Sequence, residues 1–338
     1  MASYKKNEAR AWALENMRGV ANVVIPTFTQ DLKRLNETAI RYDIEKEIEY
    51  GFYGTLLVSE VAISVEEYAR FVAVAAETAA GRLCLIHHAA FGTLQENIEA
   101  VQAAEKHGAE LILLSYPANY HPTSEQEIYD YTKSFCDSTN LGVMIFPVPL
   151  WGFERLHPAG MSPELVDRMV DNIHNIVAIK AESGMPTIGG FVQAWRKYEG
   201  KIVVSMPLEA EALMLAALVP LKFSGTSNTE FYGPMIPRIL KLMQNDKFDE
   251  AMELYWQIHP ARMANMHASA YVPQTLFLNR MLWKYQGWLS GFNGGPLRQP
   301  TMKVSPRTMA DLRRALTAAG LDPTPEPDSE FFIGRNPE

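Results

Sequence analysis

The sequence has few cysteines and no long apolar stretch. Its two cysteines, Cys84 and Cys136, lie in unrelated segments of the 338-residue chain. They can build neither a disulfide framework nor a CxxC metal site, and a reducing compartment is the simplest interpretation. No run of 18 apolar residues occurs, and residues 1–18 mix both charges without the apolar region of a signal peptide. These absences predict a cytoplasmic protein that does not enter a membrane.

Positive charge is also scarce. The 31 Lys and Arg residues stand against 39 Asp and Glu, which gives a formal net charge of −8, and no basic block is present. A nucleic acid or an anionic membrane surface therefore has no electrostatic footprint on this chain. Phosphate loops, dinucleotide fingerprints and metal-binding motifs are absent too. The composition favours chemistry on small molecules without an added cofactor.

The chain does contain a regular alternation of short apolar runs and helical patterns, which is typical of βα units around a parallel sheet. Eight runs are predicted to be strands: 20–28, 54–59, 83–89, 110–116, 142–148, 176–181, 201–206 and 221–225. Helices between them are expected to begin at capping boxes: Ser64 to Glu67, Thr93 to Glu96 and Ser124 to Glu127. Eight such units predict a (β/α)8 TIM barrel.

This barrel is expected to span residues 19–245. A helical lead-in, residues 1–18, precedes it, and a C-terminal helical region, residues 246–322, follows it. The final stretch, 323–338, is rich in Pro and Asp and is expected to lie along the surface or to be loose. The chain is thus one barrel with a helical extension.

Functional residues of such a barrel lie where the strands end. Lys180 closes the run 176–180 and is a single amine on an otherwise apolar strand. Burial favours a neutral amine, which attacks a carbonyl to form a Schiff base, and the protonated imine then withdraws electrons from the adjacent bond. The alternative is a lysine whose stem packs while its amine reaches solvent.

The segment 175–184 resembles the strand that carries the imine-forming lysine in the dihydrodipicolinate synthase / N-acetylneuraminate lyase family of class I aldolases. Pro26-Thr27-Phe28, Tyr116-Pro117 and Ser227-Asn228 support this resemblance in the right order. The stretch 294–300 is similar to the hydratase-aldolase branch. The resemblance implies a barrel with C-terminal helices, a 2-oxo acid such as pyruvate bound as an imine on Lys180, and a homo-oligomer, commonly a tetramer.

Three departures from the family pattern bear on the chemistry. Where relatives carry a Tyr-Asn-x-Pro run whose phenol shuttles protons, this chain has Phe146, which has no exchangeable proton. The arginine that dihydrodipicolinate synthases place nearby falls at Trp151, which argues against lysine-biosynthetic activity. The Gly-Thr-Thr-Gly-Glu loop that holds the pyruvyl carboxylate is missing, and Ser59 and Glu60 occupy its place. Main-chain N–H groups would then have to supply most carboxylate contacts.

Other residues are candidates for the missing proton transfer. His87 and His88 end one strand, and neighbours on a strand point to opposite sides, so one of them, with His88 favoured, should face inward. Glu182 follows Lys180 by two residues and could be a base or a partner in a loop salt bridge, and Glu60 or an ordered water are further options. A structural histidine bonded to backbone is the alternative for His88.

Aromatic residues are expected to wall the substrate pocket. Phe146 and Trp151 follow the fifth run and Tyr120 follows the fourth, although ordinary core or lid packing would also explain them. Gly225, at the end of the eighth run, is a further candidate for substrate contact.

The favoured hypothesis is a Schiff-base lyase, an aldolase or hydratase-aldolase that joins or separates a 2-oxo acid and an apolar or aromatic aldehyde-type partner. A dehydratase or specialised synthase on the same scaffold is the alternative within the class. A barrel that binds a small ligand without turnover, having lost the phenol and the Thr-Thr loop, is the alternative outside it.

Overall fold

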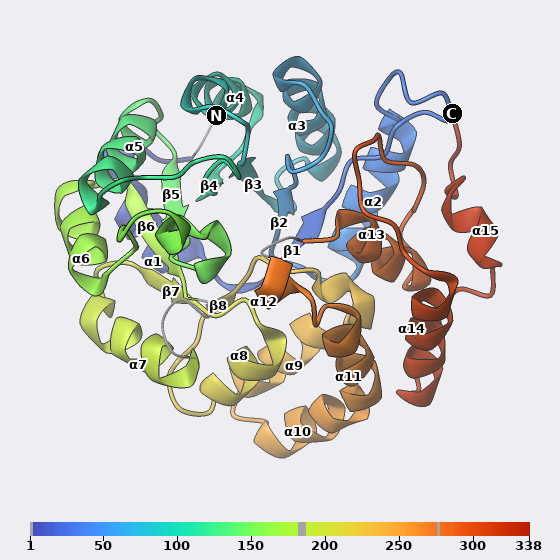
Figure 1. The fold of residues 1–338 in the computed structure, drawn as a ribbon. Coiled ribbons are helices and arrows are strands. Elements are labelled where there is room, and N and C mark those ends of the chain that lie inside the picture. Colours follow the sequence, from blue (N-terminus) through green and yellow to red (C-terminus); the bar gives the residue numbers. More distant parts are fainter. Residues whose placement is uncertain (1–2, 182–186, 276–277) are drawn as a thin grey trace.

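The structure, a computed structural model, describes residues 3–181, 187–275 and 278–338 (Figure 1). Eight parallel strands form a nearly closed barrel surrounded by helices, so the predicted (β/α)8 barrel with C-terminal helices is confirmed. Each strand overlaps one predicted run. The strands are β1 (Gly19–Val24), β2 (Gly54–Leu57), β3 (Cys84–Ala89), β4 (Leu111–Leu114), β5 (Gly142–Ile145), β6 (Ile176–Lys180), β7 (Val203–Ser205) and β8 (Phe223–Ser224).

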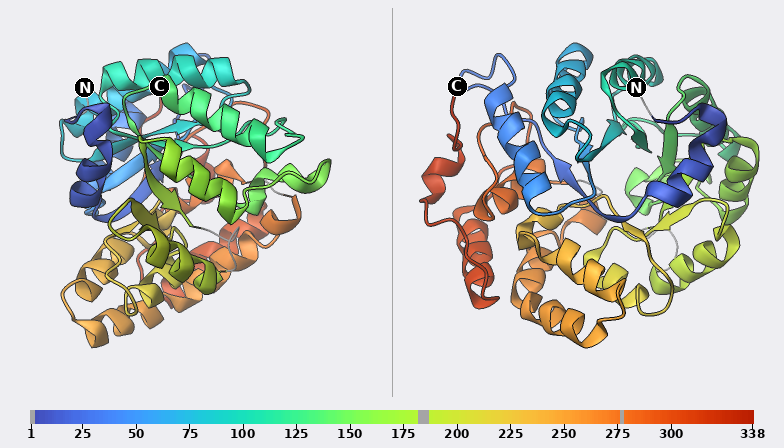
Figure 2. Two further views of the ribbon diagram at one scale, coloured as in Figure 1. Left: turned by 90° about the vertical axis from the view of Figure 1, so that its left-hand side faces the viewer. Right: turned by 180° about the vertical axis from the view of Figure 1, so that it is seen from behind.

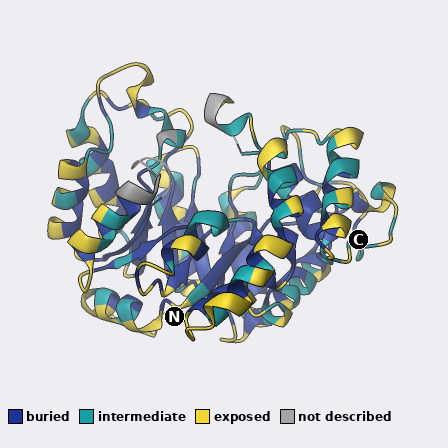
Figure 3. Ribbon diagram, turned by 90° about the horizontal axis from the view of Figure 1, so that it is seen from below, coloured by how far each residue is buried: buried dark blue, intermediate teal, exposed yellow. Residues whose placement is uncertain are grey.

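Helices cover the outside of the barrel, and their buried faces pack on the strands (Figure 3). The side chains of Ser64, Thr93 and Ser124 each accept a hydrogen bond from the backbone N–H three residues on, as the capping pattern predicts. The helices of this ring are α2 (Glu37–Glu49), α3 (Val65–Ala79), α4 (Leu94–His107), α5 (Glu125–Asp137), α6 (Pro163–Asn172), α7 (Thr187–Tyr198), α8 (Glu209–Leu215) and α9 (Met235–Met243).

Side chains close the seam between β7 and β8, which are the two ends of the hydrogen-bonded sheet. Ser205 Oγ donates to the carbonyl oxygen of Gly225 at 2.8 Å and accepts from the Gly225 N–H at 3.1 Å. From the other side of the seam, Ser224 Oγ donates to the carbonyl oxygen of Met206 at 2.7 Å. Two hydroxyl groups thus replace part of the ladder that the short strand β8 does not provide.

Helix α1 (Ala9–Asn16) covers the amino ends of the strands. The guanidinium of Arg10 donates to the carbonyl oxygens of Ile176, at 2.9 Å, and of Ile173, at 3.0 Å. Ala9 and Ala13 have no exposed surface. In the left view of Figure 2 the loop after β5, with the short helices η2 (Pro149–Trp151) and η3 (Phe153–Arg155), projects from the face opposite α1. The carboxyl ends of the strands are therefore the open face.

The C-terminal helices pack along one side of the barrel, and α12 and α13 lie near its open face (Figure 1). They are α10 (Phe248–Gln257), α11 (His259–Ala268), α12 (Val272–Thr275), α13 (Arg280–Leu289), α14 (Pro306–Ala318) and α15 (Asp328–Phe331). A four-residue 3-10 helix, η4 (Thr229–Tyr232), connects β8 to α9. Within the described ranges no helix has the length and apolar character that a membrane crossing requires.

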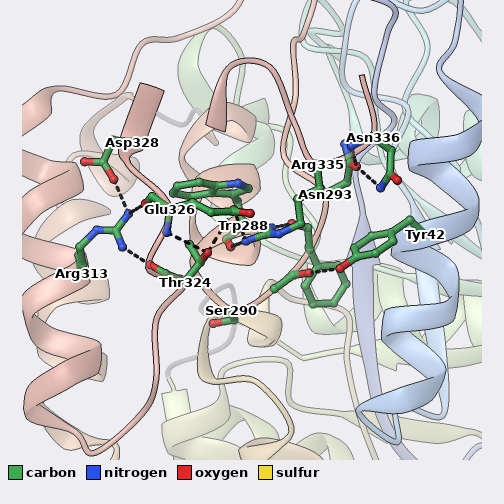
Figure 4. Close-up of polar contacts among 12 residues, drawn as sticks. Tyr42, Trp288, Ser290, Asn293, Arg313, Thr324, Glu326, Asp328, Arg335 and Asn336 are labelled. Atoms are coloured by element: carbon green, nitrogen blue, oxygen red, sulfur yellow. Dashed lines mark hydrogen bonds and ion pairs between the residues drawn. The ribbon is translucent and has the colours of Figure 1, made fainter. Parts of the chain in front are cut away.

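The segment 323–338, expected to lie along the surface or to be loose, lies along the surface and is docked onto the C-terminal helices. Phe331 of α15 has no exposed surface and its ring lies 5.8 Å from the ring of Trp288. An ion pair between Arg313 and Asp328 holds the same helix at 2.6 Å (Figure 4). Composition suggested a loose end because the partners of these anchoring side chains lie outside the segment.

Replacing Gly225 by alanine is expected to destabilise the barrel. A Cβ atom at this position would lie 2.8 Å from Ala21 Cβ and 2.8 Å from the Ala21 carbonyl oxygen, so β8 would have to move away from β1. Overpacking of this kind costs about 1–3 kcal/mol, which urea unfolding followed by circular dichroism would measure. Gly92→Ala is the control, because its Cβ would meet no atom nearer than 3.5 Å. Equal midpoints for the two variants would contradict the close packing of Gly225 against Ala21 of β1.

Candidate active site

Lys180 is the last residue of β6 and lies inside the open end of the barrel. Its side chain is buried, with 6% of the residue exposed, and its Nζ atom lies 3.9 Å from the centroid of the Phe146 ring. Phe146 follows β5, which pairs with β6, and Lys180 itself is in register with Ser205 of β7. An aromatic face is a favourable neighbour for an amine that carries charge. The strand end therefore presents the amine against an apolar ring.

A cavity of about 330 Å³ lies next to Trp151, the aromatic neighbour of Phe146. Trp151 connects the two, because its ring packs edge-on against Phe146 at 5.5 Å and also lines the cavity. The indole Nε1 donates to the backbone carbonyl oxygen of Phe146 at 2.6 Å, and this bond fixes the orientation of the indole ring. Tyr116, Glu60 and Arg155 are among the other lining residues. The cavity thus has an aromatic wall and charged groups at its edge.

Tyr120, a predicted wall residue, lies behind that wall. Its ring stacks on Tyr116 at 5.9 Å with an interplanar angle of 13°, and it also packs against Tyr131 and Phe153. Burial raises the pKa of the Tyr120 phenol. Tyr120 therefore supports the aromatic wall from the side of α5.

His88 faces the interior, but both of its ring nitrogens are engaged. The backbone N–H of Ser59 donates to Nδ1 at 3.3 Å, so Nδ1 carries no proton, and Nε2 lies 2.9 Å from Ser115 Oγ. Ser59 Oγ in turn donates to the carbonyl oxygen of His88 at 2.7 Å. Burial lowers the pKa of His88 to about 4. The neutral ring thus connects the ends of β2, β3 and β4 through hydrogen bonds.

His87 points to the helix side of β3, as alternation along the strand requires. Its ring packs edge-on against Tyr68 of α3 at 5.3 Å and has no exposed surface. Among the described residues neither of its ring nitrogens has a hydrogen-bond partner, and burial lowers its pKa to about 3. The structure therefore does not bring His87 to Lys180, contrary to its place among the candidate substrate contacts.

Glu60 follows β2 and reaches the cavity, with 31% of its side chain exposed. It forms an ion pair with Arg280, a residue of α13 that is 7% exposed. Burial alone would raise the pKa of Glu60, but the charges of Arg280 and Lys180, among others, hold it below the usual value. Glu60 is thus an ionised carboxylate at the edge of the cavity, and the charge of Lys180 contributes to its lowered pKa.

The polar side chains of α13 were missed at the sequence level. Gln286 accepts from Asn228 Nδ2 at 2.7 Å, and Lys284 Nζ donates to the Pro26 carbonyl oxygen at 2.9 Å and to Thr27 Oγ1 at 2.6 Å. Together with the Arg280 ion pair, these contacts place α13 across the carboxyl ends of β8, β1 and β2. The available signal was the polar spacing 280, 284 and 286 in an otherwise largely apolar helix.

Lys284 is a second buried lysine. Burial lowers its pKa to about 7, although the charge of Asp43 acts in the opposite direction. Its hydrogen bonds to the end of β1 occupy the amine. Any labelling of lysine in this protein must therefore distinguish Lys180 from Lys284.

Gly225 and Glu182 are the remaining candidate substrate contacts. Gly225 lies in the seam, where Ser205 uses both its N–H and its carbonyl oxygen, so its backbone serves closure of the barrel. Glu182 lies outside the described residues. Within the described part of the chain, no group of three or more His, Cys, Asp or Glu side chains is placed to hold a metal ion.

His88 is expected to stay neutral, with its proton on Nε2, between about pH 5.5 and about pH 8, because its folded pKa lies below the usual histidine range. Nitrogen-15 NMR of the imidazole ring measures this state, and His88→Gln assigns the signal. An imidazolium signal assigned to His88 at about pH 6 in the folded protein would show that the hydrogen bonds to Ser59 and Ser115 do not hold the ring as described.

Comparison with known proteins agrees with this architecture. The sequence profile of the Dihydrodipicolinate synthetase family matches residues 16–319. A 4-hydroxy-tetrahydrodipicolinate synthase from Methanopyrus kandleri is 22% identical over 312 residues, which cover 91% of this chain and 98% of that protein.

Solved structures share the fold at lower identity. N-acetylneuraminate lyase from Fusobacterium nucleatum superposes with a TM-score of 0.72 at 19% identity, covering 89% of this chain and 98% of the other. PhdJ bound to a substrate intermediate gives 0.73 at 15% identity, covering 94% and 97%. The family match over most of the chain confirms the resemblance inferred from residues 175–184 and favours an enzyme over a barrel without turnover. The chain belongs to the dihydrodipicolinate synthetase family and is a lyase of the class I aldolase type, a divergent member of that family.

Proposed function

We propose that Lys180 condenses with a 2-oxo acid, such as pyruvate, to form the imine through which this lyase acts. The observation that carries the proposal is the buried amine at the end of β6, held 3.9 Å from an aromatic ring beside a cavity. Addition of Nζ to the carbonyl carbon gives a carbinolamine, and loss of water from it converts the new C–N bond into the C=N bond of the imine. The protonated imine then accepts electrons from an adjacent bond, and an enamine results. No added cofactor is needed for these steps.

The second substrate is an apolar or aromatic aldehyde-type compound. The wall of the cavity formed by Trp151 and Tyr116 suits a flat apolar group, and the edge-on contact between these rings, 5.7 Å between centroids, keeps the wall rigid. Trp151 also stands where dihydrodipicolinate synthases carry an arginine for a second carboxylate. Aldol cleavage or hydratase-aldolase chemistry is the favoured reaction, and water elimination or a specialised condensation is the alternative on the same imine.

Two further expectations come from the family alone. A homo-oligomer, commonly a tetramer, and a cytoplasmic location stay predictions for this chain. Light scattering on the purified protein measures the first.

Borohydride reduction in the presence of pyruvate is expected to label Lys180 irreversibly, because reduction converts the imine into a stable secondary amine. Intact-mass and peptide mass spectrometry locate the adduct, and Lys284 should remain unmodified. Lys180→Ala should abolish both the adduct and turnover, whereas Lys201→Ala, which removes an exposed lysine, should change neither. Folded protein that gives no adduct with any 2-oxo acid would contradict the proposal.

Aromatic aldehydes are expected to react with pyruvate more efficiently than small polar aldehydes. Trp151→Leu should lower kcat/KM for an aromatic aldehyde by about 10-fold or more, because it removes ring contact and the hydrogen bond that orients the wall. The same variant should affect a small aldehyde, such as glyoxylate, much less. Equal losses for both aldehydes would show that the wall does not select the partner. Product analysis by NMR distinguishes cleavage, condensation and water elimination.

A further inference from the structure

We propose that Glu60, held in place by Arg280 of the C-terminal helix α13, takes the proton from carbon 3 of the 2-oxo acid bound to Lys180. This inference rests on the proposed imine at Lys180. It names the group that transfers the proton in place of the phenol that relatives carry at the position of Phe146. Glu60 is the catalytic residue in this scheme, and Arg280 is a positioning residue that acts through it.

Three other polar side chains among the described residues at this end of the barrel are engaged elsewhere. His88 uses both ring nitrogens, toward Ser59 and Ser115. The hydroxyl of Tyr116 lies 2.6 Å from Thr132 Oγ1 on α5, away from the cavity. Ser205 Oγ binds both backbone groups of Gly225. None of these groups can accept a proton without giving up a bond that holds the barrel.

Glu60 differs from these groups because it lines the cavity and keeps part of its side chain exposed there. The charged and titratable groups that act on it are Arg280 from α13, His88 from β3 and Lys180 from β6. Arg155 lines the same cavity from η3. The positive charges of Arg280 and Lys180 favour the ionised carboxylate at neutral pH. The ionised carboxylate is the form that accepts a proton.

Arg280 is built to hold one position. Its guanidinium carbon lies 4.3 Å from the centroid of the Trp283 ring, and its Nη2 pairs with Glu60. Its buried Nε atom has no hydrogen-bond partner among the described residues, so within this part of the chain the ion pair with Glu60 is the only polar bond of the side chain. Lys284 and Gln286 anchor the rest of α13 to the ends of β1 and β8. The C-terminal region thus places the guanidinium of Arg280 against Glu60, in the loop after β2.

In the proposed step Glu60 takes one proton from carbon 3. The electrons of that C–H bond form a second bond between carbons 2 and 3, and the electrons of the imine double bond move to Nζ of Lys180. The products are a neutral enamine and a protonated Glu60. Reversal of the step in deuterium oxide places deuterium on carbon 3, so the step can be followed without knowledge of the aldehyde.

The test combines deuterium exchange into pyruvate, followed by proton NMR, with borohydride trapping. Glu60→Gln should lose exchange by about 100-fold or more, since a general base contributes about that much, and should still be trapped at Lys180. Glu60→Asp, which keeps a carboxylate, should recover part of the exchange. Exchange in Glu60→Gln within a few-fold of the unaltered protein would overturn the inference, as would loss of trapping in this variant while it remains folded. Absence of trapping in the unaltered protein would instead contradict the imine itself, so the two failures are distinguishable.

Arg280→Gln tests the positioning role through the pH profile of exchange. Removing the cation raises the pKa of Glu60, so the rise of the exchange rate with pH should move to higher pH, and Arg280→Lys should restore it in part. Arg262→Gln is the matched control, because Arg262 forms a comparably buried ion pair with Glu209, at 2.6 Å, between α11 and α8. It should lower stability without moving the profile.

Two outcomes would contradict the role of Arg280. An unmoved profile in folded Arg280→Gln would show that Arg280 does not act through Glu60. A profile that is unmoved while half-maximal trapping requires about 10-fold more pyruvate would assign Arg280 to the substrate carboxylate instead.

Discussion

All eight strands run in the same direction, and this constraint determines where chemistry can take place. Their carboxyl ends meet on one face, so residues that are far apart in the chain, such as Glu60 and Lys180, come to lie on the same face. The amino ends are covered by α1, which leaves the opposite face for the substrate. The barrel is completed by hydroxyl groups of Ser205 and Ser224, because β8 is too short to complete the ladder with backbone bonds.

Relative to the family pattern, the site exchanges a phenol for an apolar ring. Phe146 packs against the amine of Lys180 and is oriented through the indole of Trp151, so the region around the amine becomes aromatic. In the proposed reaction such surroundings suit an apolar partner substrate, and proton transfer falls to a group outside β5. The carboxylate that we propose for this transfer, at the end of β2, is paired with a cation from the C-terminal helices.

The C-terminal region is therefore part of the open face as well as a support for the barrel. Helix α13 contacts the ends of β8, β1 and β2 through side chains that bond to a side-chain amide, a backbone carbonyl and a carboxylate, respectively. These contacts couple the stability of the extension to the geometry of the site. The docked segment at the chain end strengthens the same unit through Phe331 and Asp328.

The sequence by itself determined the eight strands, the lysine that ends β6 and the absence of a phenol at Phe146, because hydrophobic periodicity and residue identity are local properties. The alternation along β3 also separated His87 from His88. Only the tertiary structure decided that His88 is held by Ser59 and Ser115, that Tyr120 stands behind Tyr116, and that Arg280 pairs with Glu60 across 220 residues. These are contacts between side chains on different elements, and they depend on how the elements pack, which no local pattern encodes.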